Sequence, residues 1–517
     1  MSARIAMLVL TSLLAAAVHA DEDDRGQARA PLVVTQGTVV RNVTVVDTRD
    51  GSLARGMSVV IDGGKIQKVT ARPVRVRGAA QSVNGAGKYV VPGFNDMHTH
   101  AMVAVDQTPP YWPEMIANGI TGIREMAGSA AVIQRVRQLN ADSAAGHVDA
   151  PEVLQIASDI FVGLSASVPP APASAADAVK FVQQEKALGA DFIKTTAGNA
   201  PSILALLAEA RNDGLYVAGH LTPALSALDS SNAGWHSIEH LGAGWGLLMD
   251  CSTQEKALRD SYNGGAGTHL VLTPMAVINP RAYDAALNAP VFYQPIIDTY
   301  SEDKCESLAS AFVKNESWQV PTLIRLRTQD WGNDPVYSQS PLLAYVDKTR
   351  LALWTLVAQQ FATLPPSAVE TLHRFYALQK KVTRMLKRKG GKMLAGSDLG
   401  GGWVVPGFSL HQEFHELAES GLTPLEILQM TTLNAAEFLG RESTMGTVEA
   451  GRNADLVLLD RNPVENVDHL DDIAGVFLKG KYFSRNDLQK MLADVATAYG
   501  NQPLSDPESA LDPNHKD

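Results

Sequence analysis

Two histidines separated by a single residue are the first feature of this sequence that could do chemistry. His98 and His100 end an apolar segment, residues 88–94 and onward, that has the composition of a β-strand. Side chains of an extended chain alternate between its two faces, so both imidazoles point to the same side. Neutral imidazole is the commonest protein ligand for zinc and related metals. The pair therefore predicts part of a metal site at the end of a strand.

Four further residues with ligand or base chemistry lie at the ends of short apolar segments. They are Lys194, His220, His240 and Asp398. One such residue alone is more often a satisfied structural residue than a ligand. Six of them, each at the end of a predicted strand, indicate a common site, because a barrel brings the carboxyl ends of its strands to one rim.

The segments that carry these residues alternate with helical stretches, which is the pattern of a parallel sheet with crossover helices. We predict an α/β fold with a (β/α)8 TIM-like barrel over residues 95–440, interrupted by a helical insertion within residues 242–315. The eight strands are expected at residues 90–100, 122–126, 153–157, 191–195, 216–220, 237–241, 320–324 and 393–397.

Both ends of the chain outside the barrel have a different pattern. Residues 31–94 contain short β-rich runs separated by Asp-Gly and Gly-Gly turn signals, and residues 441–484 contain similar runs. We predict that the two regions form one small β-sandwich domain. A C-terminal helix and a polar tail are expected for residues 485–517.

The first residues have the pattern of a secretory signal peptide, residues 1–20. Arg4 gives the charged start, residues 5–18 are apolar, and Ala20 is the small residue before the expected cleavage site. The apolar run is shorter than the roughly 20 residues that a membrane span needs. We expect an exported protein, periplasmic or secreted, without a stable membrane anchor after cleavage. In such a protein Cys251 and Cys305 either form a disulfide or remain unpaired thiols.

The charge balance argues against one class of partner. The chain has 44 Lys and Arg against 55 Asp and Glu, a formal net charge of -11 and a pI near 5.6. It has no basic stripe of the kind that follows a phosphate backbone. We therefore expect a small-molecule substrate and no nucleic acid. The sequence leaves the oligomeric state open, including a homo-oligomer.

Together these motifs resemble the amidohydrolase superfamily, and within it the imidazolonepropionase-related group that includes Xaa-Pro dipeptidase-like enzymes. The resemblance extends over about residues 31–484. It is carried by the motifs at residues 92–100, 119–126, 189–194, 396–398 and 446–457, together with those around His220 and His240.

The resemblance implies a centre with two divalent metal ions, expected to be Zn²⁺. His98 and His100 would bind the buried ion, and His220 and His240 the more exposed one. Asp398 would bind the first ion and act as general base. Lys194, carboxylated by CO2, would bridge both ions, because an ammonium can only donate whereas a carbamate offers two oxygens. A metal-bridging hydroxide would then attack the scissile carbonyl.

Arg124 and His411 are predicted to contact the substrate. Arg124 follows the second strand and could pair with a substrate carboxylate. A salt bridge with a barrel acid such as Glu125 or Asp96 explains it equally well. His411 lies four residues before His415 on a predicted helix, without the glutamate that a zincin helix has directly after its first histidine. We predict a role at the substrate rim for His411 and a packed or solvated structural role for His415.

The resulting prediction is an exported dinuclear metal-dependent amidohydrolase that cleaves an amide bond in a dipeptide or an N-acyl amino acid. The dipeptidases that the chain resembles carry a substrate-contacting histidine near the end of the third strand, and residues 157–160 contain none. A hydrolase of a cyclic amide, lactone or ester, such as a toxin or antibiotic, is the alternative. A mononuclear deaminase-like enzyme would not need Lys194, and a non-enzymatic binding protein would not need the complete ligand set.

Overall fold

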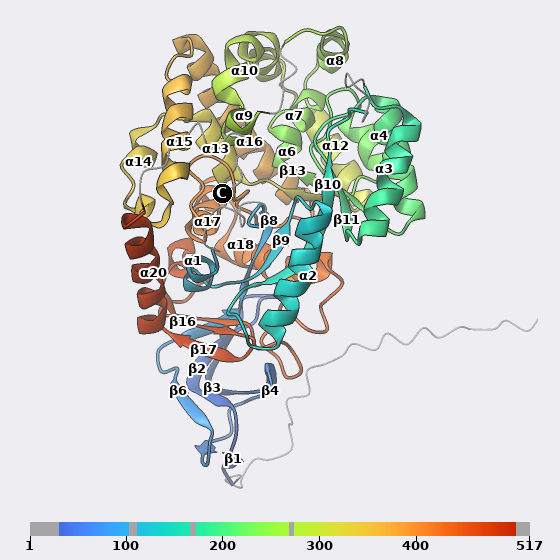
Figure 1. The fold of residues 1–517 in the computed structure, drawn as a ribbon. Helices are drawn as coiled ribbons and strands as arrows, with labels where there is room; N and C mark the ends of the chain where they lie inside the picture. Colours follow the sequence, from blue (N-terminus) through green and yellow to red (C-terminus); the bar gives the residue numbers. More distant parts are fainter. Residues whose placement is uncertain (1–29, 103–110, 166–171, 268–272, 503–517) are drawn as a thin grey trace, which may run out of the picture.

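A computed structural model of the chain describes residues 30–102, 111–165, 172–267 and 273–502. It consists of a parallel barrel surrounded by helices and a smaller β domain at one end (Figure 1). The predicted α/β class, a TIM-like barrel with a small β domain built from both chain ends, is confirmed.

Seven parallel strands form most of the barrel wall, in chain order from β8 to β14. The register brings their carboxyl ends to one rim: Thr195 on β11 pairs with Gly219 on β12, and Gly219 pairs with Ile238 on β13. The crossover helices between consecutive strands lie outside this wall (Figure 1). The strands are β8 (Phe94–Thr99), β9 (Ile120–Glu125), β10 (Glu152–Phe161), β11 (Phe192–Thr195), β12 (Val217–Gly219), β13 (Ser237–Glu239) and β14 (Trp318–Val320).

Residues 392–399 take the place of an eighth strand and close the barrel. The backbone amides of Gln319 on β14 and Met97 on β8 donate to carbonyl oxygens on the two sides of this segment, each at 2.9 Å. The segment forms isolated parallel bridges rather than a regular strand, and Asp398 at its end has a φ of +55°. The strand expected at residues 393–397 is thus an irregular closing segment.

The strand expected at residues 320–324 is also placed differently. β14 ends at Val320, because Pro321 has no amide hydrogen to continue the ladder, and α13 begins at Leu323. The residues that were expected to extend a strand therefore form the first turn of a helix above the rim.

Helices cover the barrel wall, and several begin at a side-chain cap. Ser174 and Asp177 form a capping box at the start of α3, and Gly189 ends this helix in the left-handed conformation. The helices between the first six strands are α1 (Trp112–Ala117), α2 (Ala130–Ala144), α3 (Ala175–Leu188), α4 (Ala200–Asn212) and α5 (Ala227–Asn232).

A long helical insertion follows β13, as the sequence predicted, and a second group of helices follows β14. In Figure 1 both groups lie at the end of the barrel opposite the β domain. The first group is α6 (His240–Ala243), α7 (Gly246–Asp250), α8 (Glu255–Asn263), α9 (Pro274–Ile278), α10 (Arg281–Asn288), the π-helix Ala289–Tyr293, α11 (Gln294–Asp298) and α12 (Glu302–Lys314). The second is α13 (Leu323–Asp330), α14 (Pro335–Ser338), the 3-10 helix Pro341–Tyr345, α15 (Lys348–Phe361) and α16 (Pro366–Arg388).

The main sheet of the β domain combines strands from both ends of the chain. Its order is β17-β16-β15-β7-β2-β3-β4, with β6 beside β2 and a separate β1–β5 pair. Val457 on β15 lies opposite Val91 on β7, which continues into β8 and so connects the sheet to the barrel. The strands are β1 (Leu32–Val34), β2 (Thr38–Val46), β3 (Leu53–Asp62), β4 (Lys65–Thr70), β5 (Val74–Val76), β6 (Gln81–Asn84), β7 (Tyr89–Pro92), β15 (Leu456–Leu459), β16 (Ile473–Leu478) and β17 (Lys481–Ser484).

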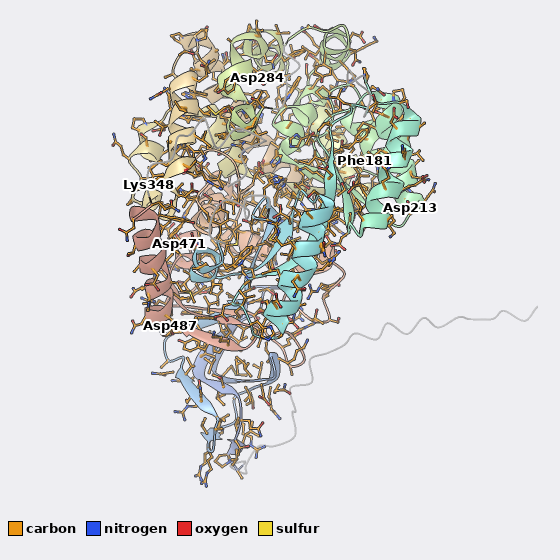
Figure 2. The ribbon with its side chains drawn as sticks, in the orientation of Figure 1. Phe181, Asp213, Asp284, Lys348, Asp471 and Asp487 are labelled. Atoms are coloured by element: carbon orange, nitrogen blue, oxygen red, sulfur yellow. A yellow bond between two sulfur atoms is a disulfide. The ribbon has the colours of Figure 1, made fainter. Side chains whose placement is uncertain are left out.

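The last helices connect the closing segment to this sheet and then return along the barrel. α20 packs against α1, and Lys348 donates from Nζ to the carbonyl oxygens of Gly500 and Gln502, at 2.8 and 2.6 Å. Figure 2 places Lys348 at the opposite end of α20 from Asp487. These helices are α17 (Phe408–Glu419), α18 (Pro424–Thr431), α19 (Leu433–Phe438), the 3-10 helix Val467–Leu470 and α20 (Arg485–Gly500).

Two sequence features lie outside the described residues, namely the signal peptide expected at residues 1–20 and the end of the polar tail, residues 503–517. Among the helices that the structure does describe, none combines the length and apolar character needed to cross a bilayer.

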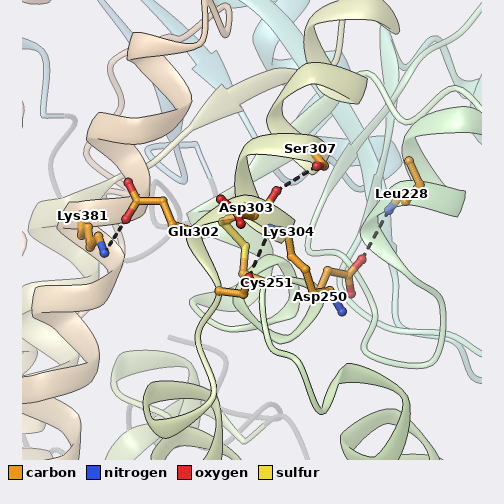
Figure 3. The surroundings of a disulfide bond; sticks show 10 residues. Leu228, Asp250, Cys251, Glu302, Asp303, Lys304, Ser307 and Lys381 are labelled. Atoms are coloured by element: carbon orange, nitrogen blue, oxygen red, sulfur yellow. Dashed lines mark hydrogen bonds and ion pairs between the residues drawn. A yellow bond between two sulfur atoms is a disulfide. The ribbon is translucent and has the colours of Figure 1, made fainter.

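Cys251 and Cys305 form a disulfide within the helical insertion (Figure 3). Both residues are fully buried, and the bond joins the end of α7 to α12 across 54 residues of sequence. Nearby, Asp250 Oδ2 accepts from the Leu228 amide, and Lys381 pairs with Glu302 at 2.7 Å. Of the two alternatives left open by the sequence, the structure shows the paired one.

Candidate metal centre

Six predicted residues lie at the carboxyl rim of the barrel, on or directly after the strands that carry them. His98 lies on β8 and His100 just beyond it, and Lys194 lies on β11. His220 follows β12, His240 follows β13, and Asp398 ends the closing segment. Because these elements share one barrel, residues up to 300 positions apart in the chain meet at one site.

Asp398 lies at the centre of this group. Its Oδ1 atom is 3.3 Å from Nε2 of His98 and 3.4 Å from Nε2 of His100, and its Oδ2 atom is 3.7 Å from Nε2 of His240. The ligand atoms of His98, His100 and Asp398 all lie within 4.8 Å of one another. His220 completes the group, with its ring centroid 5.0 Å from that of His240.

The tautomer of His98 follows from its partner on the other side of the ring. Nδ1 of His98 lies 2.6 Å from Oε2 of Glu239, a fully buried carboxylate. Burial alone would raise the pKa of Glu239, but Arg124 and His98 lower it below its ordinary value, so the carboxylate is ionised and accepts from Nδ1–H. Nε2 of a neutral His98 is then an unprotonated acceptor that faces Asp398.

His240 is oriented in the same way. Its Nδ1 contacts Oγ1 of Thr322, whose own proton is given to the carbonyl oxygen of Pro321 at 2.9 Å. Nδ1–H is therefore the donor, and Nε2 of His240 is free toward Asp398. His240 and Asp398 both have positive φ values, 52° and 55°. Such values are uncommon outside glycine and concentrate at functional sites, where surrounding structure holds them.

Burial keeps the remaining imidazoles neutral. It lowers the pKa of His100, lowers the pKa of His220 to about 3, and holds that of His240 well below its usual range. A neutral imidazole has a lone pair to offer a metal ion, whereas a protonated one has none.

Lys194 is buried among these ligands without a hydrogen-bond partner for Nζ. Burial lowers its pKa to about 8, against the opposing effect of the carboxylates Glu239 and Asp398. A lysine with a lowered pKa exposes the free amine that reacts with CO2. The position and the environment are therefore those required of a carboxylated bridging lysine.

The donor set fits a cation. Among the described residues, Nε2 of His98 and Nζ of Lys194 are buried polar atoms without a hydrogen-bond partner. The lone pair of His98 and the anionic oxygen of Asp398 face each other at 3.3 Å, an arrangement that is repulsive unless a positive charge lies between them. Imidazole and carboxylate ligands suit zinc and similar divalent ions.

Glycines allow the backbone to approach at this site. A Cβ on Gly219, which has a φ of +136°, would lie 1.9 Å from the carbonyl oxygen of Thr195. A Cβ on Gly396 would lie 2.8 Å from Cβ of His98. Both glycines directly precede the site on their strands, and larger residues would push His220 or the closing segment out of place.

The structure corrects the substrate-binding role predicted for Arg124. Its side chain is fully buried below the rim, where Nη2 lies 2.9 and 3.0 Å from the two carboxylate oxygens of Glu239 and Nε donates to the carbonyl oxygen of Met97 at 2.6 Å. The predicted alternative, a structural salt bridge, fits this geometry, but the partner is Glu239 rather than Glu125 or Asp96.

His411 is also placed away from the predicted substrate rim. Its Nε2 lies 2.9 Å from the carbonyl oxygen of Asn118, just after α1, and its Nδ1 lies 2.7 Å from Asp471. His415 contacts the same carboxylate, with Nε2 2.8 Å from Oδ2. The pair therefore joins α17 of the barrel to the β domain, because Asp471 lies between the 3-10 helix Val467–Leu470 and β16.

Three residues at the site were missed from the sequence: Glu239, Thr322 and Arg325. Glu239 directly precedes His240 in the sequence but contacts Nδ1 of His98 from another strand, so its place in the sequence did not indicate this role. Arg325 places Nε 3.2 Å from Oδ2 of Asp398. It lies on α13, just beyond the strand expected at residues 320–324, and no sequence signal indicated its position.

Comparisons with known proteins agree with this geometry. A family model described as Amidohydrolase family matches residues 376–482. An imidazolonepropionase of Shouchella clausii (strain KSM-K16) is 54% identical over 39 residues, 8% of this chain and 9% of that protein. A solved Xaa-Pro dipeptidase with bound methionine in the active site is 18% identical, with a TM-score of 0.58 over 87% of this chain and 100% of that one. The family match and the imidazolonepropionase match support the predicted relationship to the amidohydrolase superfamily.

Other relatives in the superfamily extend the likeness. An adenine deaminase of Desulfatibacillum aliphaticivorans is 24% identical over 252 residues, 47% of this chain and 41% of that protein. The chain thus spans less than half the length of the curated relatives it matches. A bottromycin amidohydrolase structure has a TM-score of 0.64 over 92% of this chain and 93% of that one, at 22% identity. At such identities the structural likeness concerns the fold.

Proposed function

We propose that this protein is a metal-dependent hydrolase that cleaves a carbon–nitrogen bond of an amide in a small substrate. One observation carries the proposal: four imidazoles, a buried unpartnered lysine and an aspartate converge at the carboxyl rim of the barrel. The superfamily membership supports hydrolysis at carbon–nitrogen bonds, because its relatives include deaminases and amidohydrolases.

The residues present would hold two divalent ions. His98, His100 and Asp398 would hold one, and His220 and His240 the other, with a carboxylated Lys194 shared between them. Such ions acidify a water molecule and polarise the carbonyl that it attacks. Zinc is the proposed metal, since its preferred ligands are those found here.

Asp398 supplies the proton transfer. The Arg325 guanidinium lies 3.2 Å from its Oδ2 atom, and this positive charge favours the ionised carboxylate, which can accept a proton. Its Oδ1 atom faces His98 and His100, where the attacking water would be held. We propose that Asp398 accepts a proton from that water and returns it to the leaving nitrogen.

A second candidate substrate class is a neutral amide, lactone or ester rather than a dipeptide. Both cationic side chains that border the site, Arg124 and Arg325, are committed to internal partners. Residues 157–160 of β10, where dipeptidases of this group have a histidine, contain none, and Ser158 Oγ accepts from the Lys194 amide at 2.9 Å. Neither feature favours a substrate with a free carboxylate.

We also propose that the protein is exported. Arg4 and the apolar residues after it resemble a signal peptide, which supports export. The buried disulfide between Cys251 and Cys305 supports it too. Disulfides persist mainly in oxidising compartments such as the bacterial periplasm.

The function is tested by metal analysis together with a substrate panel. The purified protein is expected to bind two equivalents of Zn²⁺ and to hydrolyse one class among dipeptides, N-acyl amino acids, neutral amides and lactones. Asp398→Asn should bind substrate but lose at least about 100-fold in kcat, because general-base catalysis is removed. Zinc binding without turnover of any carbon–nitrogen substrate, but with turnover of lactones, would favour the second candidate. Protein that binds no divalent ion would contradict both.

A further inference from the structure

Arg325 contacts the carboxylate that the proposed mechanism uses as its base. It lies on α13, above the rim, and its Nε donates to Oδ2 of Asp398 at 3.2 Å. The side chain is 6% exposed, so the contact is shielded from solvent. The other oxygen of Asp398, Oδ1, faces His98 and His100. The two carboxylate oxygens therefore have different partners on opposite sides.

The guanidinium is itself held at two further points. Nη1 donates to the carbonyl oxygen of Ile278 at 2.7 Å and Nη2 to that of Val277 at 2.6 Å, both at the end of α9 in the helical insertion. Three fixed donors on one planar group leave it little freedom to rotate. Arg325 thus connects the insertion to Asp398 through a rigid path of hydrogen bonds.

The loop after Asp398 leaves room for this side chain. A Cβ on Gly401 would lie 2.4 Å from both Cζ and Nη1 of Arg325 and 2.5 Å from Nε. The backbone of Gly401 is not in the left-handed region, so its lack of a side chain is required by the guanidinium rather than by its own conformation. An alanine there would displace Arg325 without changing any charge.

We propose that Arg325 is a positioning residue for Asp398. It holds the Oδ2 atom of Asp398 in place, so that the Oδ1 atom faces His98 and His100. A carboxylate without this contact can rotate and exchange its two oxygens. Loss of Arg325 should therefore weaken the ion site formed with the two histidines and slow the chemical step, while substrate affinity changes little. The inference rests on the proposed metal-dependent function.

Two different substitutions test the proposal. Arg325→Gln removes the positively charged guanidinium group, and Gly401→Ala pushes the intact arginine away from Asp398. Each should bind one of two Zn²⁺ equivalents about 10- to 100-fold more weakly, as changes to partners of metal ligands usually do. Affinity is measured on metal-free protein by competition with a chromophoric chelator, with circular dichroism and thermal unfolding to establish that each variant is folded.

Arg327→Gln is the matched control. Arg327 lies two residues along α13 and pairs with Glu416 at 2.9 Å instead of with Asp398. This variant should keep the zinc affinity and kcat of the wild type. In addition, guanidinium ion should restore part of the zinc affinity and kcat of Arg325→Ala, with KM unchanged throughout, an effect that loss of a merely structural side chain would not show.

The outcomes separate the inference from the function on which it rests. Folded Arg325→Gln and Gly401→Ala proteins with wild-type zinc affinity and kcat would overturn the positioning role while leaving the hydrolase intact. If only one of these two variants folds, the zinc affinity and kcat of the folded variant decide whether the positioning role holds. A wild-type protein that binds no zinc would overturn the proposed function, and the positioning role with it.

Discussion

Glu239 accepts a hydrogen bond from Nδ1 of His98 across 2.6 Å, in the fully buried interior of the barrel directly below the proposed metal centre. The same carboxylate pairs with Arg124, which comes from the second strand. Because Nδ1 gives its proton to Glu239, Nε2 of His98 is left as a ligand. The tautomer of His98 is thus set by a buried ion pair between Glu239 and Arg124.

Glu239→Gln should impair both metal binding and stability. The amide keeps the size of the side chain but leaves the Arg124 charge buried and unpaired, which costs about 3–5 kcal/mol. Metal affinity should fall about 10- to 100-fold, because His98 loses the partner that orients it. Urea unfolding and zinc titration measure the two effects. Glu209→Gln, at a half-buried position of α4, serves as the control, and an unchanged zinc affinity in folded Glu239→Gln would contradict the role.

Lys194→Ala should abolish activity and lose at least one zinc equivalent. The substitution removes the proposed bridging group, and it leaves a small space in the barrel interior where the buried lysine lay. Elemental analysis of the purified variant and its kcat give the result. Lys186→Ala, at an exposed position of α3, should behave as the wild type. Two bound ions with normal turnover would exclude bridging by Lys194.

The residues of the proposed metal centre could be predicted from the sequence because their evidence is local. His98 and His100 share a face by strand geometry, and His220, His240 and Asp398 each end an apolar run whose place at the rim follows from barrel topology. This prediction needed no knowledge of the distances between strands. It followed from the order of the candidate residues along the chain and from their positions at the ends of apolar runs.

The partners of those ligands could not be predicted because they depend on contacts across the barrel. Arg124 lies on β9 and Glu239 on β13, and nothing in the local sequence of either residue indicates that their side chains are in contact. A buried arginine at the end of a strand therefore has the same sequence pattern as one that binds substrate. His411 was misplaced for a similar reason, since its contact with Asp471 comes from the separately predicted β domain.

Removal of the disulfide should destabilise the helical insertion. Cys251 and Cys305 close a loop of about 54 residues, for which the chain-entropy argument gives about 4 kcal/mol. The double variant Cys251→Ser/Cys305→Ser should therefore unfold at lower urea concentration than the oxidised wild type. The wild type in excess reductant should approach the same midpoint. Two reactive thiols in the unreduced, denatured wild type would show that the bond does not form.

Glu114 should make the stability of the protein depend on pH. This residue of α1 is fully buried, and neither of its carboxylate oxygens has a hydrogen-bond partner among the described residues. Burial raises its pKa from 4.5 to about 7. Between these two values the folded state keeps the proton that the unfolded state releases. The contribution of this pKa difference to the free energy of unfolding is therefore fully present below about pH 4.5 and is lost as the pH rises through about 7.

Glu114→Gln should remove this dependence, since the amide stays neutral at every pH. The stability of the variant relative to the wild type should increase by up to about 3 kcal/mol between pH 4.5 and pH 8, which corresponds to the size of the pKa shift. Urea unfolding of both proteins at several pH values measures the difference, and Glu370→Gln on the exposed side of α16 controls for the loss of a surface charge. An equal difference at all pH values would mean that the pKa of Glu114 is the same in the folded and unfolded protein, and that a partner compensates its burial.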